Sequence, residues 1–192
     1  MFSVVTISRQ IGSGGSRFAQ ALAARCGYQL VWREVINKAA IQIGSPDVAL
    51  AMIDELGLLG LCPDPEVCQA YINAVSTVMN DYANQGKIII VGRASQVVLK
   101  NNPQVFHIRV IADLETRVKN ICKNKKVHSE AARQQINQSD TYRQDYLKKF
   151  YQVDWNDAAL YDLVLNTAKI PMTQLVNMVS TLIKDNSGEK IE

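Results

Sequence analysis

The stretch Ile7-Ser8-Arg9-Gln10-Ile11-Gly12-Ser13-Gly14-Gly15-Ser16 decides the fold. It joins a short apolar run that ends at Ile7 to a segment rich in strong helix formers, Phe18 to Ala24, which Gly27 stops. A strand, a glycine-rich loop and a helix in this order can bind an anion, because glycine permits close backbone approach and the helix start offers free N–H groups. The stretch therefore predicts a phosphate-binding loop from Gly12 to Ser16.

This loop departs from the phosphate-loop pattern G-x-x-x-x-G-K-[ST] at two fixed positions. Gly14 and Ser16 match the second glycine and the hydroxyl that contacts Mg²⁺, whereas Arg9 replaces the first glycine and Gly15 replaces the lysine. That lysine normally reaches the β and γ phosphates, so another cation has to supply its charge. Arg9 and Arg17 flank the loop and are the nearest candidates. Taken alone, the loop also fits an ordinary turn between a strand and a helix.

Outward from the loop, short apolar runs alternate with helical stretches. The runs that predict buried strands lie at 29–32, 87–91, 105–111 and 162–166, in addition to the first run. The predicted helices lie at 65–84, 113–124, 129–151 and from about 171, with Gly86 ending the first of them and Ser129 as the N-cap of the third. Strands buried on both faces and separated by helices are typical of a parallel α/β sheet, with ligands at the carboxyl ends of the strands.

Length and composition indicate a single folded domain over residues 1–192. The chain is 47% hydrophobic and 20% charged, as globular proteins are. No stretch is long enough for a membrane span, and the N-terminus lacks the pattern of a signal peptide. The 4 cysteines show no C-x-x-C spacing, which argues against a zinc site or a disulfide framework. We expect a cytoplasmic protein with no membrane partner.

Charge is distributed unevenly along the chain. No Lys or Arg occurs from Ala39 to Gly86, whereas basic residues predominate from Arg117 to Lys149. This asymmetry favours an anion-attracting surface in the C-terminal half, although a solvated helix face is an equal alternative. A surface for nucleic acid is the least favoured interpretation, because acidic residues are interspersed in the basic segment.

Several segments together resemble the cytidylate kinase-like family, a branch of the nucleoside monophosphate kinases. They are Ile7 to Gly15, Ile90-Val91-Gly92-Arg93, Asp140-Thr141-Tyr142-Arg143 with Tyr146, and Tyr161-Asp162-Leu163-Val164-Leu165-Asn166-Thr167. They occur in the family's order and span nearly the whole chain. The resemblance implies a P-loop kinase-like three-layer α/β sandwich, with a five-stranded parallel sheet, helices on both faces and a mobile helical lid. It places an acceptor-binding helical region at 39–86 and the lid at 117–149.

The resemblance also implies which residues bind the acceptor. Arg93 matches an arginine that contacts the acceptor's phosphate, with a surface ion pair as the alternative. Arg9 and Lys38 are expected on the same substrate side. Trp32 and Ala94 stand where cytidylate kinases carry aspartates, so cytidine preference and metal geometry differ from the family pattern.

The catalytic and donor-binding residues are implied in the same way. Arg143 matches a lid arginine, Asp140 lies one helical turn earlier and could orient it, and Arg117 opens the lid. A routine salt bridge is the alternative for Asp140 and Arg143. The loop from Gly12 to Ser16, with Arg17, is expected to hold ATP, and Ser16 to contact the Mg²⁺ that ATP carries.

The activity implied by the resemblance is phosphoryl transfer from ATP, with Mg²⁺, to a nucleoside monophosphate or another small phosphorylated substrate. Such a reaction needs positioning and charge and no covalent nucleophile. The alternative is a non-catalytic sensor of nucleotides or phosphate, suggested by Gly15, Trp32 and Ala94.

Overall fold

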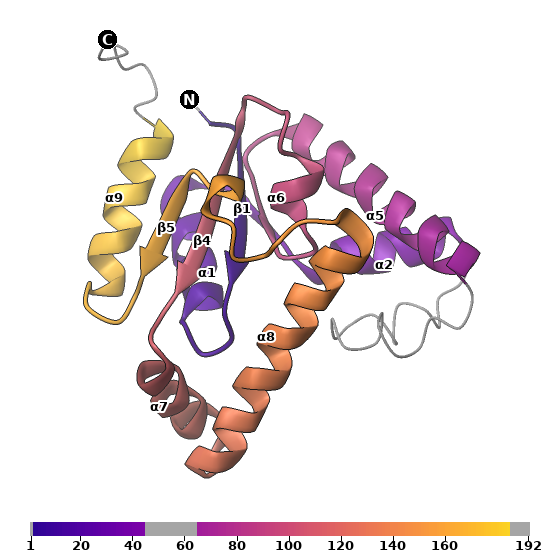
Figure 1. The fold of residues 1–192 in the computed structure, drawn as a ribbon. Helices are drawn as coiled ribbons and strands as arrows, with labels where there is room; N and C mark the ends of the chain where they lie inside the picture. Colours follow the sequence, from indigo (N-terminus) through magenta and orange to yellow (C-terminus); the bar gives the residue numbers. More distant parts are fainter. Residues whose placement is uncertain (1, 45–64, 185–192) are drawn as a thin grey trace.

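Five parallel strands form one central sheet in the order β2-β3-β1-β4-β5 (Figure 1). The structure is a computed structural model that describes residues 2–44 and 65–184. The strands are β1 (Val4–Arg9), β2 (Gln29–Val31), β3 (Ile88–Val91), β4 (Val105–Ile111) and β5 (Leu163–Asn166). The predicted five-stranded parallel sheet is therefore confirmed.

Helices cover both faces of the sheet, as predicted (Figure 1). They are α1 (Gly15–Cys26), α2 (Arg33–Gln42), α5 (Pro65–Gln85), α6 (Ser95–Val98), α7 (Leu114–Lys125), α8 (Ser129–Tyr151) and α9 (Met172–Lys184), with a short 3-10 helix at Ala158–Leu160. Helices α1 and α9 pack on one face, and α2 and α5 pack on the other. The result is a three-layer α/β arrangement.

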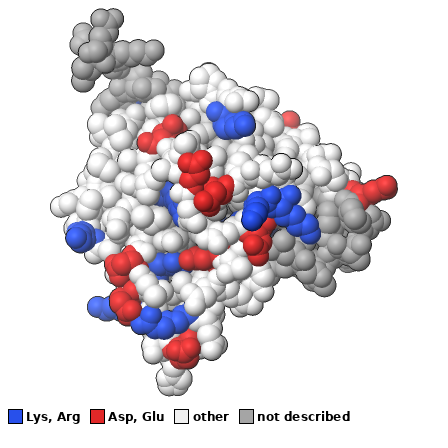
Figure 2. Space-filling view, viewed as in Figure 1, with Lys and Arg blue, Asp and Glu red and all other residues white. Residues whose placement is uncertain are grey.

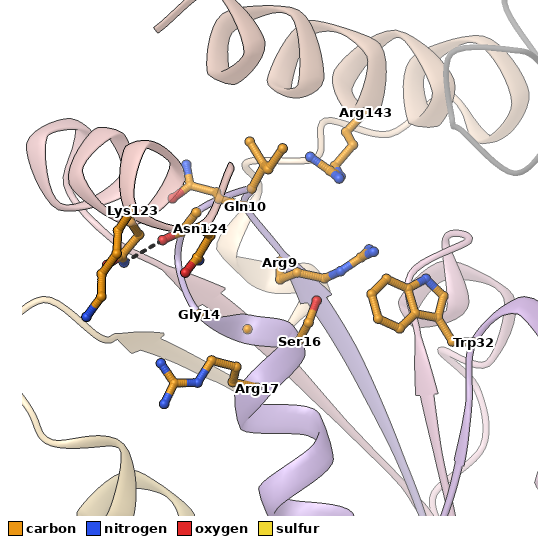
Figure 3. Close-up of a pocket in the computed structure, with 13 residues that line it drawn as sticks. Arg9, Gln10, Gly14, Ser16, Arg17, Trp32, Lys123, Asn124 and Arg143 are labelled. Atoms are coloured by element: carbon orange, nitrogen blue, oxygen red, sulfur yellow. Dashed lines mark hydrogen bonds between the residues drawn. The ribbon is translucent and has the colours of Figure 1, made fainter. Parts of the chain in front are cut away.

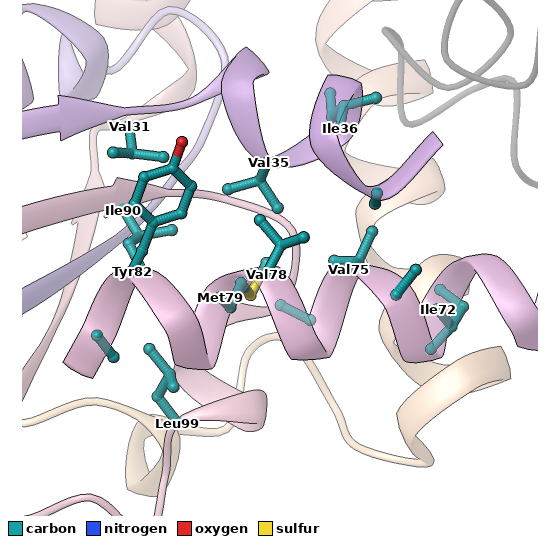
Figure 4. Close-up of a cluster of buried hydrophobic side chains, with 14 of the residues drawn as sticks. Val31, Val35, Ile36, Ile72, Val75, Val78, Met79, Tyr82, Ile90 and Leu99 are labelled. Atoms are coloured by element: carbon teal, nitrogen blue, oxygen red, sulfur yellow. The ribbon is translucent and has the colours of Figure 1, made fainter. Parts of the chain in front are cut away.

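Successive side chains of a strand point to opposite faces of the sheet, and this divides the hydrophobic core into two halves. In β1, Val4 points toward the layer of α2 and α5, whereas Val5 and Ile7 point toward α1 and α9. Figure 4 shows the first half, in which side chains of α2 and α5 pack on those of β2 and β3. Every apolar residue of β1 and β3 is buried, and β3, with the sequence IIIV, accordingly reads as a continuous hydrophobic run.

Some local predictions were incomplete or wrong. Helix α2 and the four-residue α6 were not predicted from the sequence. Ser129 is the first residue of α8 and not its N-cap, because His128 takes that position without a side-chain cap bond. Residues 45–64 of the predicted acceptor-binding region 39–86 lie outside the described residues. The described part of this region consists of the end of α2, the two residues that follow it to position 44, and α5 with Gly86.

Helices α7 and α8 form the segment predicted as the lid, and they pack on the phosphate loop. Their contact is a small apolar core of Val118, Ile121, Ala132 and Ile136, against which Ile11 of the loop also packs. The described chain therefore has the lid segment and the loop in direct contact. None of the helices built from the described residues combines the length and apolar character that crossing a membrane requires.

His107 in β4 gives the fold a pH dependence that can be measured. Its side chain is 7% exposed, and its Nδ1 lies 2.7 Å from the Thr6 hydroxyl. Burial lowers the pKa of His107, and the nearby charge of Asp162 only partly opposes this. Because the unfolded chain then binds the proton more readily, stability should fall as the pH drops below about 6.5.

We expect the free energy of unfolding, measured with urea between pH 7.5 and 5.5, to fall more steeply for the unaltered chain than for His107→Gln. Glutamine keeps a polar group in the strand but does not titrate. Equal slopes for the two proteins would contradict this assignment.

Candidate functional site

The phosphate loop runs from the end of β1 to the start of α1, and two of its glycines are required by geometry. Gly12 has a φ of 79°, and a Cβ there would lie 2.7 Å from the Arg117 carbonyl oxygen. Gly14 is the N-cap of α1 with a φ of 80° and makes no side-chain cap bond, while the Gly15 N–H donates to the Ser13 hydroxyl at 3.3 Å. The first turn of α1 also lacks acidic residues. Its N–H groups and the positive end of the helix dipole can therefore act on an anion.

Side chains hold four successive carbonyl groups of the loop. The donors are Ser13 Oγ to Gln10 O (2.8 Å), Arg117 Nε to Ile11 O (2.8 Å), Asn120 Nδ2 to Gly12 O (2.8 Å) and Thr167 Oγ1 to Ser13 O (2.6 Å). In a trans peptide the N–H points opposite to the C=O, so the amides of Gly12 and Gly14 are turned away from these donors. The loop is thus held in a fixed shape from outside.

Arg117 and Asp140 are part of this support. The Arg117 side chain is buried, and its two terminal nitrogens donate to the Asp140 carboxylate at 2.7 and 2.8 Å. Together with the bond from Nε to the loop, this engages the whole guanidinium. Asp140 was expected to orient Arg143, and the structure gives it a further partner, Arg117, that the sequence analysis did not name. Arg117 and Asp140 both position the loop, and neither lines the two cavities described next.

The main cavity lies over the loop and has a volume of about 450 Å³. Its basic lining residues are Arg9, Arg17, Lys123 and Arg143, and none of its lining residues within 2–44 and 65–184 is acidic. Figure 3 shows Arg9 reaching across the mouth of the loop toward Trp32, with Ser16 beneath it and Arg143 approaching from α8. An excess of positive charge around free helix amides suits a polyphosphate.

A second cavity, of only about 10 Å³, shares the lining residues Arg9 and Arg143 with the main cavity. Arg9, Arg93 and Arg143 all line it, and they come from the end of β1, the end of β3 and α8. Arg93 is 5% exposed, which excludes the surface ion pair considered from sequence. Arg93 and Ala94 both have left-handed backbone, with φ values of 59° and 55°. Such strain is concentrated at binding sites, where the surrounding structure imposes it.

Buried tyrosines surround Arg93. Burial raises the pKa of Tyr71 to about 12, and the charge of Arg93 opposes the rise. Burial likewise raises the pKa values of Tyr146 and Tyr151, which also lie within reach of the Arg93 charge. Arg93 therefore acts from a mostly apolar surrounding, where its charge is weakly screened.

Arg143 is placed by polar and aromatic neighbours. Its Nη1 donates to the Ser139 hydroxyl one turn earlier, and its guanidinium carbon lies 5.8 Å from the centre of the Trp155 ring. Trp155 is buried, and its indole N–H donates to the Ser8 hydroxyl at 2.8 Å. Trp155, which follows α8 and contacts Arg143, is thus hydrogen-bonded to Ser8 near the end of β1.

Arg17 lies at the loop as expected, whereas Lys38 lies apart from it. Arg17 is exposed on α1 and points away from Arg9 and Trp32, although it borders the main cavity (Figure 3). Lys38 is exposed on α2, and its ammonium group lies 4.2 Å from the centre of the Tyr82 ring. It lines none of the three cavities that border the loop.

Other residues of the site were missed from the sequence. Asn120 and Thr167 donate hydrogen bonds to the loop. Trp155 lies beside Arg143, and Tyr71 lies near Arg93. Lys123 lines the main cavity. Two signals were present: the basic composition of the 117–149 segment included Lys123, and the segment 161–167 that resembles the family ended at Thr167.

The site fits a polyphosphate better than a protein-held metal ion. No cluster of three or more His, Cys, Asp and Glu that could hold a metal occurs within residues 2–44 and 65–184. Ser16 supplies the one hydroxyl among the lining residues of the main cavity. A Mg²⁺ ion would therefore have to arrive on the phosphates, with Ser16 as its contact to the chain.

Charges on the surface of α7 and α8 alternate in sign. On the face seen in Figure 2, basic and acidic side chains lie next to one another and do not form one continuous basic surface. Arg133 of α8, for example, donates to Glu115 of α7 at 2.7 Å. This face is thus unlike the extended basic surfaces that bind nucleic acids.

Comparison with known proteins identifies relatives over most of the chain. The family model described as "Cytidylate kinase-like family" matches residues 4–169. A cytidylate kinase of Ignicoccus hospitalis is 27% identical over 94% of this chain and 99% of its own length. One of Methanocaldococcus jannaschii is 30% identical over 54% of this chain, and the match spans only 59% of that relative's length.

Solved structures support the fold. An uncharacterized protein from Eubacterium ventriosum has a TM-score of 0.74 at 20% identity, covering 94% of this chain and 97% of its own. Shikimate kinase from Acinetobacter baumannii, in complex with shikimate, has a TM-score of 0.56 at 11% identity, covering 98% of this chain and 97% of its own. At these identities the likeness concerns the fold alone.

The buried ion pair below the loop should contribute strongly to stability. We expect Asp140→Ala to lower the free energy of unfolding by about 3 kcal/mol, because Arg117 is left buried without its counter-charge. Chemical denaturation measures the change. The matched control is Glu115→Ala, which removes the exposed pair with Arg133 and should cost less than about 1 kcal/mol. Equal losses in the two variants would contradict the supporting role of Arg117 and Asp140.

Gly15 should tolerate a side chain only when Arg9 is shortened. A Cβ on Gly15 would lie 2.5 Å from the Arg9 Cβ and 3.0 Å from its Cγ. We expect Gly15→Ala to lower the free energy of unfolding by about 1–3 kcal/mol through overpacking. In the Arg9→Gly background the same substitution should cost clearly less. A double-mutant cycle by chemical denaturation measures this coupling, and additive effects would show that the two positions are independent.

Proposed function

The chain belongs to the cytidylate kinase-like family, and we propose from this premise that it transfers a phosphoryl group from ATP to a nucleoside monophosphate or a similar small phosphorylated acceptor. One observation carries the proposal: Arg93 and Arg143, which come from different elements, line one small cavity that shares Arg9 and Arg143 with the cavity over the phosphate loop. Because the reaction requires a donor and an acceptor phosphate side by side, adjoining basic cavities suit it.

The donor belongs over the loop. The first-turn amides of α1 and the positive side chains of the main cavity would hold the β and γ phosphates of ATP. When bound, Mg·ATP supplies the phosphoryl group and a metal ion that shields its charge. Ser16 would contact that ion. A cytoplasmic location is part of the proposal, because ATP is the donor.

The acceptor phosphate belongs at Arg93. A guanidinium can bind a phosphate through two parallel N–H bonds, and the buried, strained backbone of Arg93 fixes where its side chain begins. The apolar surrounding makes this charge more effective than a surface arginine would be.

Arg143 would act on the group in transfer. It is the arginine of α8 that lines both cavities, so a phosphoryl group passing from one to the other would pass beside it. Positive charge placed where negative charge accumulates lowers the barrier, and loss of one such group typically costs about 10²–10³-fold in rate.

The alternative function is a nucleotide sensor that no longer transfers phosphate. It is favoured by Gly15 in place of the lysine and by the lack of acidic residues among the described residues that line the main cavity. Such a protein would bind ATP through the same loop amides without turnover.

A kinase assay separates these functions. Purified protein is incubated with Mg·ATP and a panel of nucleoside monophosphates, and ADP formation is followed. We expect turnover with at least one acceptor, lowered about 100-fold or more in Arg143→Met and in Arg93→Met. The matched control is Arg133→Met on α8, an arginine that pairs with Glu115 at the surface and should leave turnover near its original value. Stabilisation by ATP against heat without turnover across the panel would replace the kinase proposal with the sensor.

A further inference from the structure

The missing lysine of the phosphate loop is explained by the residue that stands six positions earlier. A Cβ on Gly15 would lie 2.5 Å from the Cβ of Arg9, 3.0 Å from its Cγ and 3.2 Å from the Cβ of Val110. A Cβ is fixed to its backbone, so the two positions cannot both carry side chains in this loop geometry. In the common pattern the first of these positions is glycine and the second is lysine. Here the order of glycine and basic residue is reversed, with Arg9 at the first position and Gly15 at the second.

The Arg9 side chain takes the space that a residue-15 side chain would occupy. Its stem passes over Gly15, and its guanidinium carbon lies 4.9 Å from the centre of the Trp32 ring. Figure 3 shows the guanidinium held between the loop and Trp32. Stacking uses the flat face of a guanidinium, while its N–H donors point outward in the plane, so an arginine can stack and bind phosphate at once.

Of the basic residues around the loop, Arg9 has the placement that a substitute for the lysine needs. It lines the main cavity and also the small cavity that contains Arg93. Arg17 points away from Trp32, and Lys123 projects from the last turn of α7 on the far side of the loop (Figure 3). Arg143 is held by Ser139 on α8 and approaches from above the cavity.

We propose that Arg9 takes over the work of the missing lysine: stacked on Trp32 and given room by Gly15, it neutralises the terminal phosphates of a bound polyphosphate. The exchange moves the charge from the start of α1 to the end of β1. It also places this charge at the border with the acceptor cavity, where one guanidinium can contact both phosphates. The inference deepens the proposed function and rests on it for the identity of the nucleotide, but polyphosphate binding can be tested separately.

The probe is inorganic tripolyphosphate, which needs no base pocket and no acceptor. Isothermal titration calorimetry should give an affinity at least about 10-fold weaker for Arg9→Met than for the unaltered chain, because a phosphate-facing charge is lost. Arg25→Met is the matched control, since Arg25 is exposed in the last turn of α1 and should leave the affinity unchanged. Circular dichroism checks the fold, and Arg9→Gln, which keeps a polar group but no charge, replaces Arg9→Met if that variant does not fold.

The exchange itself is tested by reversing it. The double variant Arg9→Gly with Gly15→Lys should recover tripolyphosphate affinity relative to Arg9→Met, whereas Gly15→Lys alone should lower the melting temperature because its stem collides with Arg9. Unchanged affinity in Arg9→Met, or no tripolyphosphate binding by the unaltered chain, would overturn the inference. Weakened binding in Arg9→Met together with no turnover by the unaltered chain would support the inference and reject the kinase proposal.

Discussion

The site depends on one constraint: the phosphate loop must turn its carbonyl groups outward before its amides can serve an anion. Four successive carbonyls, from Gln10 to Ser13, accept hydrogen bonds from side chains, and three of those side chains come from distant segments of the chain. Asn120 and Arg117 belong to α7, and Thr167 follows β5. The loop shape is therefore a tertiary property, although the glycines that permit it are local.

This constraint connects stability and binding. Asp140 of α8 holds Arg117, and Arg117 in turn holds the carbonyl of Ile11. The segment predicted as a lid thus has two parts with different tasks. One side of α7 and α8 supports the loop through buried contacts, and Arg143 faces the cavities. A preformed loop has less entropy to lose when a ligand binds.

The sequence predicted the sheet and the loop, because these depend on local patterns and on the rule that strand ends meet at one edge. The roles of Arg93 and Arg143 were implied only by the family resemblance, and the structure places both residues at one small cavity. The sequence did not predict the pairing of Asp140 with Arg117. Spacing along α8 suggested Arg143, but the buried side of that helix faces α7, and Arg117 is 23 residues away. Asn120 and Trp155 carry no motif, since their roles arise only where their elements pack. Thr167 ends a segment that resembles the family, but its bond to the loop also requires the packed structure. The steric relation of Arg9 to Gly15 likewise requires coordinates, although both departures from the pattern are visible in the sequence.

The central claim is that backbone amides at the start of α1 bind the phosphates directly, and amide NMR tests it most directly. In the ¹⁵N-labelled protein, pyrophosphate should produce the largest shifts at the amides from Gly12 to Arg17 and at the Arg9 Nε. Shifts confined to the outer surface of α7 and α8, with the loop amides unchanged, would contradict it.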